Sequence, residues 1–148
     1  MTCDAHRAQT ASLLARANRR DLISLIDELL QLNPGITVDT LRPPETGTVQ
    51  LRVREPVCDE RFILADALVT VAEVSVNGVA GWAMRLGTDS EATVAAALAD
   101  SFVAQPNQIA GVERVTSLVE TTAHEVKEAR RVAVRRALGT VIDFEELD

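Results

Sequence analysis

A stretch in the middle of the chain, from Arg42 to Asp66, carries a dense set of polar side chains that could contact a ligand or a partner protein. It combines the turn-forming run Arg42-Pro-Pro-Glu45-Thr46-Gly47 with a strand of alternating apolar and polar residues. Arginine makes bidentate contacts with carboxylates and phosphates, and paired carboxylates can exchange protons with a substrate. The residues that we single out as substrate-proximal or partner-contacting are Arg42, Glu45, Thr46, Gly47, Gln50, Arg61 and Asp66.

Two kinds of chemistry are open to this stretch. Four arginines could form a phosphate or phosphonate site, although pairing with nearby acids is the simpler interpretation because surface ion pairs are common. These are Arg42, Arg52, Arg54 and Arg61. The carboxylates of Glu45 and Asp66 could instead form an acid–base pair of a hydrolase. A role in turns is the simpler alternative, since both acids stand beside predicted turn or bulge residues.

Motifs for metal binding, nucleophilic catalysis and phosphate cradling are missing from the sequence. Cys3-x-x-His6 has the spacing of metal ligands but lacks the second pair that a structural zinc site needs. There is no Gly-x-Ser-x-Gly elbow and no Gly-x-x-x-x-Gly-Lys-Ser/Thr loop. We therefore predict no catalytic, cofactor-binding or metal-binding residue within this chain.

A second basic group lies near the end of the last predicted helix, where cations complement the helix dipole. It comprises Lys127, Arg130, Arg131, Arg135 and Arg136. An acidic tail, residues 140–148, follows. A solvated helix face, or pairing with that tail, explains this group without any ligand.

Composition narrows the class of protein. The 148 residues carry a net charge of −7, which argues against a nucleic-acid binder because phosphate-binding surfaces need a positive excess. Apolar runs are too short to cross a membrane, and the N-terminus lacks a signal layout. Without an export signal, Cys3 and Cys58 are expected to be reduced thiols. These observations favour a cytoplasmic protein.

Helical periodicity fills the first part of the chain, residues 4–32, with a break at Asn18. Asn33-Pro34-Gly35 ends this helical region. Two short strands are predicted next, over 36–41 and 49–54. The Pro43-Pro44 kink and a turn or bulge at Glu45-Thr46-Gly47 separate them.

The following segment, 62–76, predicts a central strand that Asp66 interrupts with a bulge or an end. Asn77-Gly78 predicts a type I′ hairpin. The return strand is expected to point Ala80, Trp82, Met84 and Leu86 inward. Helices are predicted from Thr88-Asp89-Ser90-Glu91 to Pro106 and over 107–138, the latter with an apolar stripe of Val and Ala. The expected fold is one α+β domain, residues 1–148, in which helices flank a four-stranded antiparallel meander spanning 36–87.

The polar residues of the middle stretch also carry a family resemblance. Their order and spacing resemble the PhnG family, a small subunit of the bacterial carbon–phosphorus lyase system for phosphonate use. The matching positions are Arg42, Glu45-Thr46-Gly47, Val49-Gln50, Glu60-Arg61-Phe62, Asp66, Thr70, Gly81, Gly87 and Asp89. The chain departs from the family pattern at Thr10-Ala11 and at Ala65.

The resemblance implies a place inside a complex with PhnI, PhnH and PhnJ. With PhnH, PhnI and PhnL, such chains are required to transfer the ribose 5-triphosphate moiety of ATP to methylphosphonate, displacing adenine. The chain would thus be a subunit of a transferase, alpha-D-ribose 1-methylphosphonate 5-triphosphate synthase, and inactive when isolated. ATP and an iron–sulfur cluster would be handled by other chains, and this one would have a non-catalytic or assembly role. A free-standing phosphate or phosphonate binder that uses the arginine cluster is the alternative.

Overall fold

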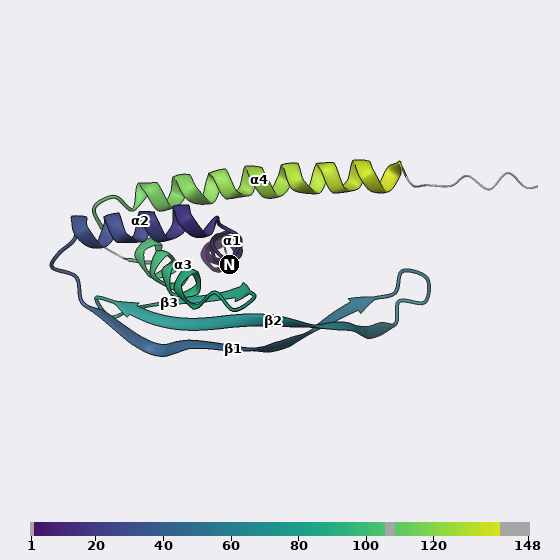
Figure 1. The fold of residues 1–148 in the computed structure, drawn as a ribbon, viewed down its shortest axis with the longest axis horizontal. Coiled ribbons are helices and arrows are strands. Elements are labelled where there is room, and N and C mark those ends of the chain that lie inside the picture. The colour runs from purple at the N-terminus through teal and green to yellow at the C-terminus, as the bar shows by residue number, and fades with distance from the viewer. Residues whose placement is uncertain (1, 106–108, 140–148) are drawn as a thin grey trace, which may run out of the picture.

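Three layers make up the molecule in its computed structural model, which describes residues 2–105 and 109–139. A sheet forms one outer layer, helix α3 (Ser90–Val103) packs on one of its faces, and α4 (Glu113–Leu138) lies on the far side (Figure 1). Helices α1 (Thr2–Leu14) and α2 (Arg19–Leu32) fill the space between. The predicted α+β class is confirmed.

One sheet of three antiparallel strands is present within the described residues, and the expected fourth strand is not among them. Its order is β1 (Val38–Arg54), β2 (Arg61–Val76) and β3 (Val79–Leu86), with β2 in the centre. The prediction of four strands is wrong because the two segments expected on either side of Pro43-Pro44 form one continuous strand. Register shifts between Thr40 and Glu45 accommodate the prolines. An edge strand tolerates prolines because its outer side needs no hydrogen-bond donor.

The turn or bulge predicted at Glu45-Thr46-Gly47 is found one step earlier, as the register shift between Arg42 and Glu45. Gly47 pairs with Val69 inside the ladder, and its φ is not in the left-handed region. Asp66 likewise pairs regularly with Gln50, and the nearby register shift falls between Leu51 and Arg52. The irregularities therefore lie beside these residues: two are in β1 before Glu45, and one is in β2, where the register passes over Leu64.

The hairpin between β2 and β3 is confirmed. Asn77 and Gly78 both have positive φ, 49° and 80°, and Val76 pairs with Val79. The side chain of Asn77 also accepts a hydrogen bond from the Thr37 amide at 2.9 Å. This contact ties the start of β1 to the turn.

The inward side of β3 is the opposite of the one expected. Gly81 and Ala83 are buried against α3, whereas Trp82 is 43 % exposed and Leu86 is 78 % exposed. A Cβ on Gly81 would lie 2.1 Å from the carbonyl oxygen of Ala97. The helix packs so closely that only the face with small residues can meet it.

The helices begin and end at recognisable signals. Asn18 caps α2 by accepting a hydrogen bond from the Arg20 amide, and Asp89 caps α3 by accepting one from Ala92. The last helix begins at Glu113, after a turn in which Gly111 has a φ of 84°. The expected start at 107 falls on residues outside the described ranges.

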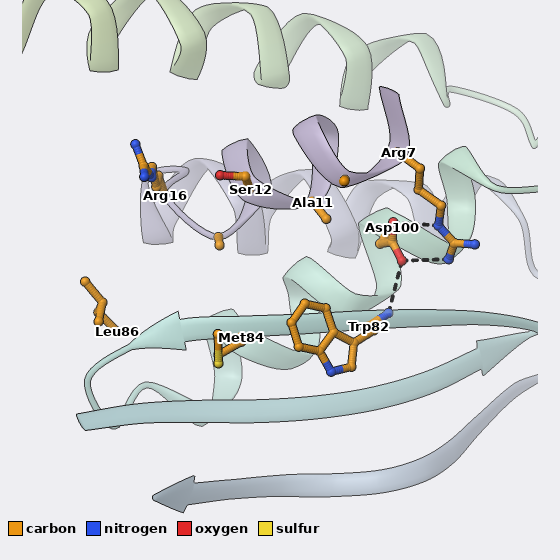
Figure 2. Close-up of a pocket in the computed structure, with 10 residues that line it drawn as sticks. Arg7, Ala11, Ser12, Arg16, Trp82, Met84, Leu86 and Asp100 are labelled. Carbon is orange, nitrogen blue, oxygen red and sulfur yellow. Dashed lines mark hydrogen bonds and ion pairs between the residues drawn. The ribbon is translucent and has the colours of Figure 1, made fainter. Parts of the chain in front are cut away.

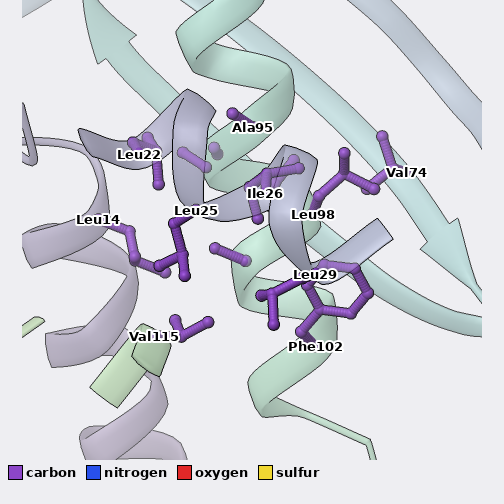
Figure 3. Close-up of a cluster of buried hydrophobic side chains, with 14 of the residues drawn as sticks. Leu14, Leu22, Leu25, Ile26, Leu29, Val74, Ala95, Leu98, Phe102 and Val115 are labelled. Carbon is purple, nitrogen blue, oxygen red and sulfur yellow. The ribbon is translucent and has the colours of Figure 1, made fainter. Parts of the chain in front are cut away.

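The hydrophobic core lies where α2, α3 and the sheet meet (Figure 3). Its largest fully buried side chains all come from helices: Phe102, Leu14, Leu22 and Leu29. Val115 joins this core from the start of α4, but residues 129–138 of that helix are all exposed. The predicted apolar stripe of the last helix is therefore buried only at its N-terminal end. None of the described helices is long and apolar enough to cross a membrane.

Candidate functional site

The candidate residues all belong to the long β1–β2 ladder, and they are distributed along it. The guanidinium of Arg42 donates to the Glu45 carboxylate at 3.0 Å, three residues along the same strand. Gln50 and Asp66 are direct cross-strand partners, and Arg61 faces Arg54 at the far end of the ladder. These residues therefore form a polar line along two strands.

Thr46 joins a hydrogen-bonded chain across all three strands. Its hydroxyl lies 3.0 Å from the hydroxyl of Thr70, and Thr70 donates to the Gly87 carbonyl at 2.8 Å. Because the single proton of Thr70 goes to Gly87, Thr46 must donate to Thr70. Thr70 is fully buried, so this chain has a structural role in the centre of the sheet.

The acid–base pair that the sequence suggested is not formed. Glu45 pairs with Val71, and Asp66 lies five positions further along β2. Five strand residues span about 17 Å. An odd number of positions also places the two carboxylates on opposite faces of the sheet, because side chains alternate. They cannot act on one substrate atom.

The four arginines are not brought together either. Arg42 pairs with Glu73 and Arg52 with Ile63, ten positions apart along β2. That separation is about 33 Å. Arg54 is also engaged by Asp59 at 2.6 Å. Only Arg52, Arg54 and Arg61 are neighbours.

Beyond β3, the first two strands continue as a two-stranded ribbon. We call this ribbon the arm, defined by residues 48–54 and 61–68 with the connecting turn 55–60. The arm extends well past the end of β3, whose last residue, Leu86, pairs with Val69 of β2 (Figure 1). Not one residue of the arm is buried, although it carries several large apolar side chains. These are Leu51, Val57, Phe62, Ile63, Leu64 and Leu68.

The turn at the tip of the arm is ordered by one carboxylate. Glu55 accepts hydrogen bonds from the backbone amides of Val57, at 2.9 Å, and Cys58. Both bonds favour the charged form, and they hold the pKa of Glu55 below its usual value. Asp59 has a positive φ of 56° in the same turn. The thiol of Cys58 is free and exposed.

A groove of about 900 Å³ lies between α1 and β3 (Figure 2). Small α1 side chains, among them Ala8 and Ala11, line one side, and Trp82, Met84 and Leu86 line the other. Arg7 and Asp100 close one end. The groove is mainly apolar, so it is suited to binding rather than to proton transfer.

Asp100 is the polar centre of this region, and it is not among the residues predicted from the sequence. Its side chain is almost fully buried and accepts from Arg7 at 2.8 Å and from the backbone amide of Trp82 at 3.1 Å. Arg7 also donates to the Ala80 carbonyl at 2.8 Å. A signal was available, because Asp100 follows Ala96 by four residues and so lies on the apolar stripe of α3.

Arg85 ties the opposite end of the groove to the helices. Its guanidinium donates to the carbonyls of Leu14, at 2.8 Å, and Ala17, at 3.0 Å, just where α1 ends. Burial lowers the pKa of Arg85, and the nearby carboxylate of Asp89 partly opposes this shift. The contact satisfies carbonyl groups that a helix C-terminus leaves without partners.

Among the residues that the structure describes, no three His, Cys, Asp or Glu side chains are arranged to share a metal ion. A family model with the description "Phosphonate metabolism protein PhnG" matches residues 5–147. No match was found among curated proteins.

Proposed function

The chain belongs to the PhnG family of phosphonate metabolism proteins, and from this premise we propose that it is a non-catalytic assembly subunit of a phosphonate carbon–phosphorus lyase core complex. Its partners in this proposal are PhnI-, PhnH- and PhnJ-like chains, with PhnL. Together with PhnH, PhnI and PhnL it supports transfer of the ribose 5-triphosphate moiety of ATP to methylphosphonate, with loss of adenine. The other chains handle ATP and the iron–sulfur cluster, and the complex works in the cytoplasm.

The arm is the observation that supports an assembly role best. Two-stranded ribbons are at best marginally stable in water without a third strand or a covering helix. Here the ribbon continues beyond β3 and beyond α3, so neither covers it (Figure 1). Phe62, Ile63 and Leu64 are 47 %, 53 % and 60 % exposed. An exposed apolar projection of this kind is typical of a surface that another chain covers.

Burial of the arm against a partner would also stabilise a complex. Fully burying a large apolar side chain contributes about 1.5–3 kcal/mol relative to leaving it exposed. Phe62, Ile63 and Leu64 are each roughly half exposed, so a partner that covered them would gain about 1 kcal/mol from each. Leu51 and Leu68 add to the same surface. This is enough to matter for complex formation, since about 1.4 kcal/mol corresponds to a tenfold change in affinity.

A non-catalytic role fits the state of the candidate polar groups. Arg42 is engaged by Glu45, and Thr46 by Thr70, so their polar atoms already have partners within the sheet. Glu45 and Asp66 lie on opposite faces of it, as argued above. These side chains organise the ladder that carries the arm.

The proposal is tested by purifying the chain alone and after co-expression with PhnI-, PhnH- and PhnJ-like chains. We expect the isolated chain to self-associate and the co-expressed chain to elute in one complex of defined stoichiometry. An isolated chain that is monodisperse, folds cooperatively and does not bind the PhnI-like chain would contradict the assembly role.

A further inference from the structure

The outer half of α4 carries a basic surface that neither the sheet nor the other described helices cover. We call it the basic strip; it consists of Lys127, Arg130, Arg131, Val134, Arg135 and Leu138. Successive members are three or one residues apart, and every second member is four residues along, so all six share one face of the helix. They line a shallow hollow of about 510 Å³. Figure 1 shows this part of α4 projecting beyond α1 and α2.

The strip concentrates positive charge with little compensation. Arg131 pairs with Glu128 at 2.8 Å. Within residues 2–105 and 109–139, the side chains of Lys127, Arg130 and Arg135 make no hydrogen bond or ion pair. Lys127, Arg131 and Arg135 follow one another at four-residue spacing, where like charges destabilise a helix. The net charge of the whole chain is −7, so the strip is a local exception.

We infer that the basic strip binds the acidic C-terminal segment of the same chain, residues 140–148. This segment reads Thr-Val-Ile-Asp-Phe-Glu-Glu-Leu-Asp and lies outside the described residues. It offers four carboxylates to the four cations of the strip. It also offers Phe144 and Leu147 to the two apolar members, Val134 and Leu138. Charge and hydrophobicity are therefore complementary along both partners.

The length of the segment allows this contact within one chain. The strip runs back from Leu138 to Lys127, eleven residues at 1.5 Å each, or about 16 Å. Nine extended residues reach about 30 Å. The segment begins directly after Gly139, so it can reverse direction and still cover the whole strip. Being joined to the strip, it also binds at a high effective concentration.

Phosphate-rich surfaces are poorer candidates for the occupant. An amphipathic helix that binds a membrane presents a broad apolar face, whereas the strip has only Val134 and Leu138. A nucleic acid would meet repulsion from the net negative charge of the remaining chain. Binding of the chain's own acidic segment needs no broad apolar face, and the segment is already held beside the strip by the covalent chain. The inference does not depend on the proposed function.

The test is nuclear magnetic resonance of the full-length, isotopically labelled chain. Arg135→Glu reverses one charge of the strip, and Arg136→Glu makes the same change one residue along, on the opposite face of α4. We expect Arg135→Glu to move the backbone amide signals of residues 142–147 toward unstructured values, and Arg136→Glu to leave them nearly unchanged. Salt at about 0.5 M should reproduce the effect in the unaltered chain, because screening weakens exposed ion pairs.

Two outcomes would overturn the inference. If neither Arg135→Glu nor salt moves the signals of residues 142–147, the segment does not contact the strip. If the signals move only on changing protein concentration about tenfold, the occupant is the segment of a second copy, because only an intermolecular contact depends on concentration. The salt titration of the unaltered chain keeps the test decisive even where a charge reversal destabilises α4.

Discussion

The hydroxyl groups of Thr46 and Thr70 lie 3.0 Å apart across the β1–β2 ladder, and they link all three strands. The Thr70 hydroxyl donates a hydrogen bond to the carbonyl of Gly87, which directly follows β3. These hydrogen bonds lie where β3 ends and the arm begins, since Thr70 is next to Val69, the partner of Leu86. The hydrogen bonds therefore mark the point at which the covered sheet becomes an uncovered ribbon.

Thr70→Val keeps the shape of the buried side chain and removes both hydrogen bonds. We expect a loss of about 1 kcal/mol in the free energy of unfolding, equivalent to a melting temperature lower by about 3 °C. Thr48→Val, at an exposed position of the same ladder, serves as the control. Equal melting temperatures for the two variants would show that the hydrogen bonds of Thr70 contribute nothing to the stability of the fold.

Gly81 and Gly47 should differ strongly in their response to substitution by alanine. A Cβ at Gly81 would meet backbone atoms of Ala97 and Ser101 at 2.1 and 2.6 Å, whereas nothing lies within 4 Å of one at Gly47. Gly81→Ala must push α3 from the sheet, and we expect it to cost about 3 kcal/mol or more. Gly47→Ala should change stability by less than about 0.5 kcal/mol. Chemical denaturation of both variants measures the difference; similar midpoints would refute the close packing of α3.

Asp100→Asn tests the buried carboxylate. Arg7 is half exposed, so the loss is smaller than for a fully buried ion pair, and we expect about 2 kcal/mol. The matched change Asp27→Asn, on the exposed face of α2, should have little effect. Tryptophan fluorescence reports the same event, because Asp100 accepts from the Trp82 amide. Unchanged fluorescence and stability would remove Asp100 as an organiser of the groove.

The turn at the arm tip should lose order in acid. The folded-state pKa of Glu55 is lowered, so its carboxylate contributes order above the unfolded-state pKa of about 4.3, and the contribution is lost as the pH falls through the lower folded-state value. Amide signals of Val57 and Cys58 should shift over this window. Glu55→Gln should abolish the shift, and a pH response that survives this substitution would assign it to another group.

Local signals predicted much of the fold. Asn18, Asn33 and Asp89 mark the helix ends as their side-chain chemistry indicates, and Asn77-Gly78 forms the expected hairpin. These features depend on contacts within a few residues. They can therefore be inferred from the chain alone.

Features that depend on distant packing were not predictable. Pro43-Pro44 indicates a break in an isolated strand, yet pairing with β2 carries β1 through it. The inward side of β3 is set by the close approach of α3 to Gly81, which alternation of apolar residues does not reveal. The same holds for the candidate site: Glu45 and Asp66 lie on adjacent strands, but the register and the pleat separate them and place them on opposite faces.

The arm is the proposed surface through which the chain joins its complex, and one co-purification measures this directly. A tagged PhnI-like chain is co-expressed with three forms of this protein: unaltered, Phe62→Ser/Ile63→Ser, and Leu32→Ser. Leu32 is comparably exposed, at 54 %, but lies at the end of α2 farthest from the arm (Figure 1). We predict that the arm variant is recovered about tenfold less than the unaltered chain, as a loss of about 1.4 kcal/mol implies, and that Leu32→Ser is recovered normally. Equal recovery of all three forms would contradict the account.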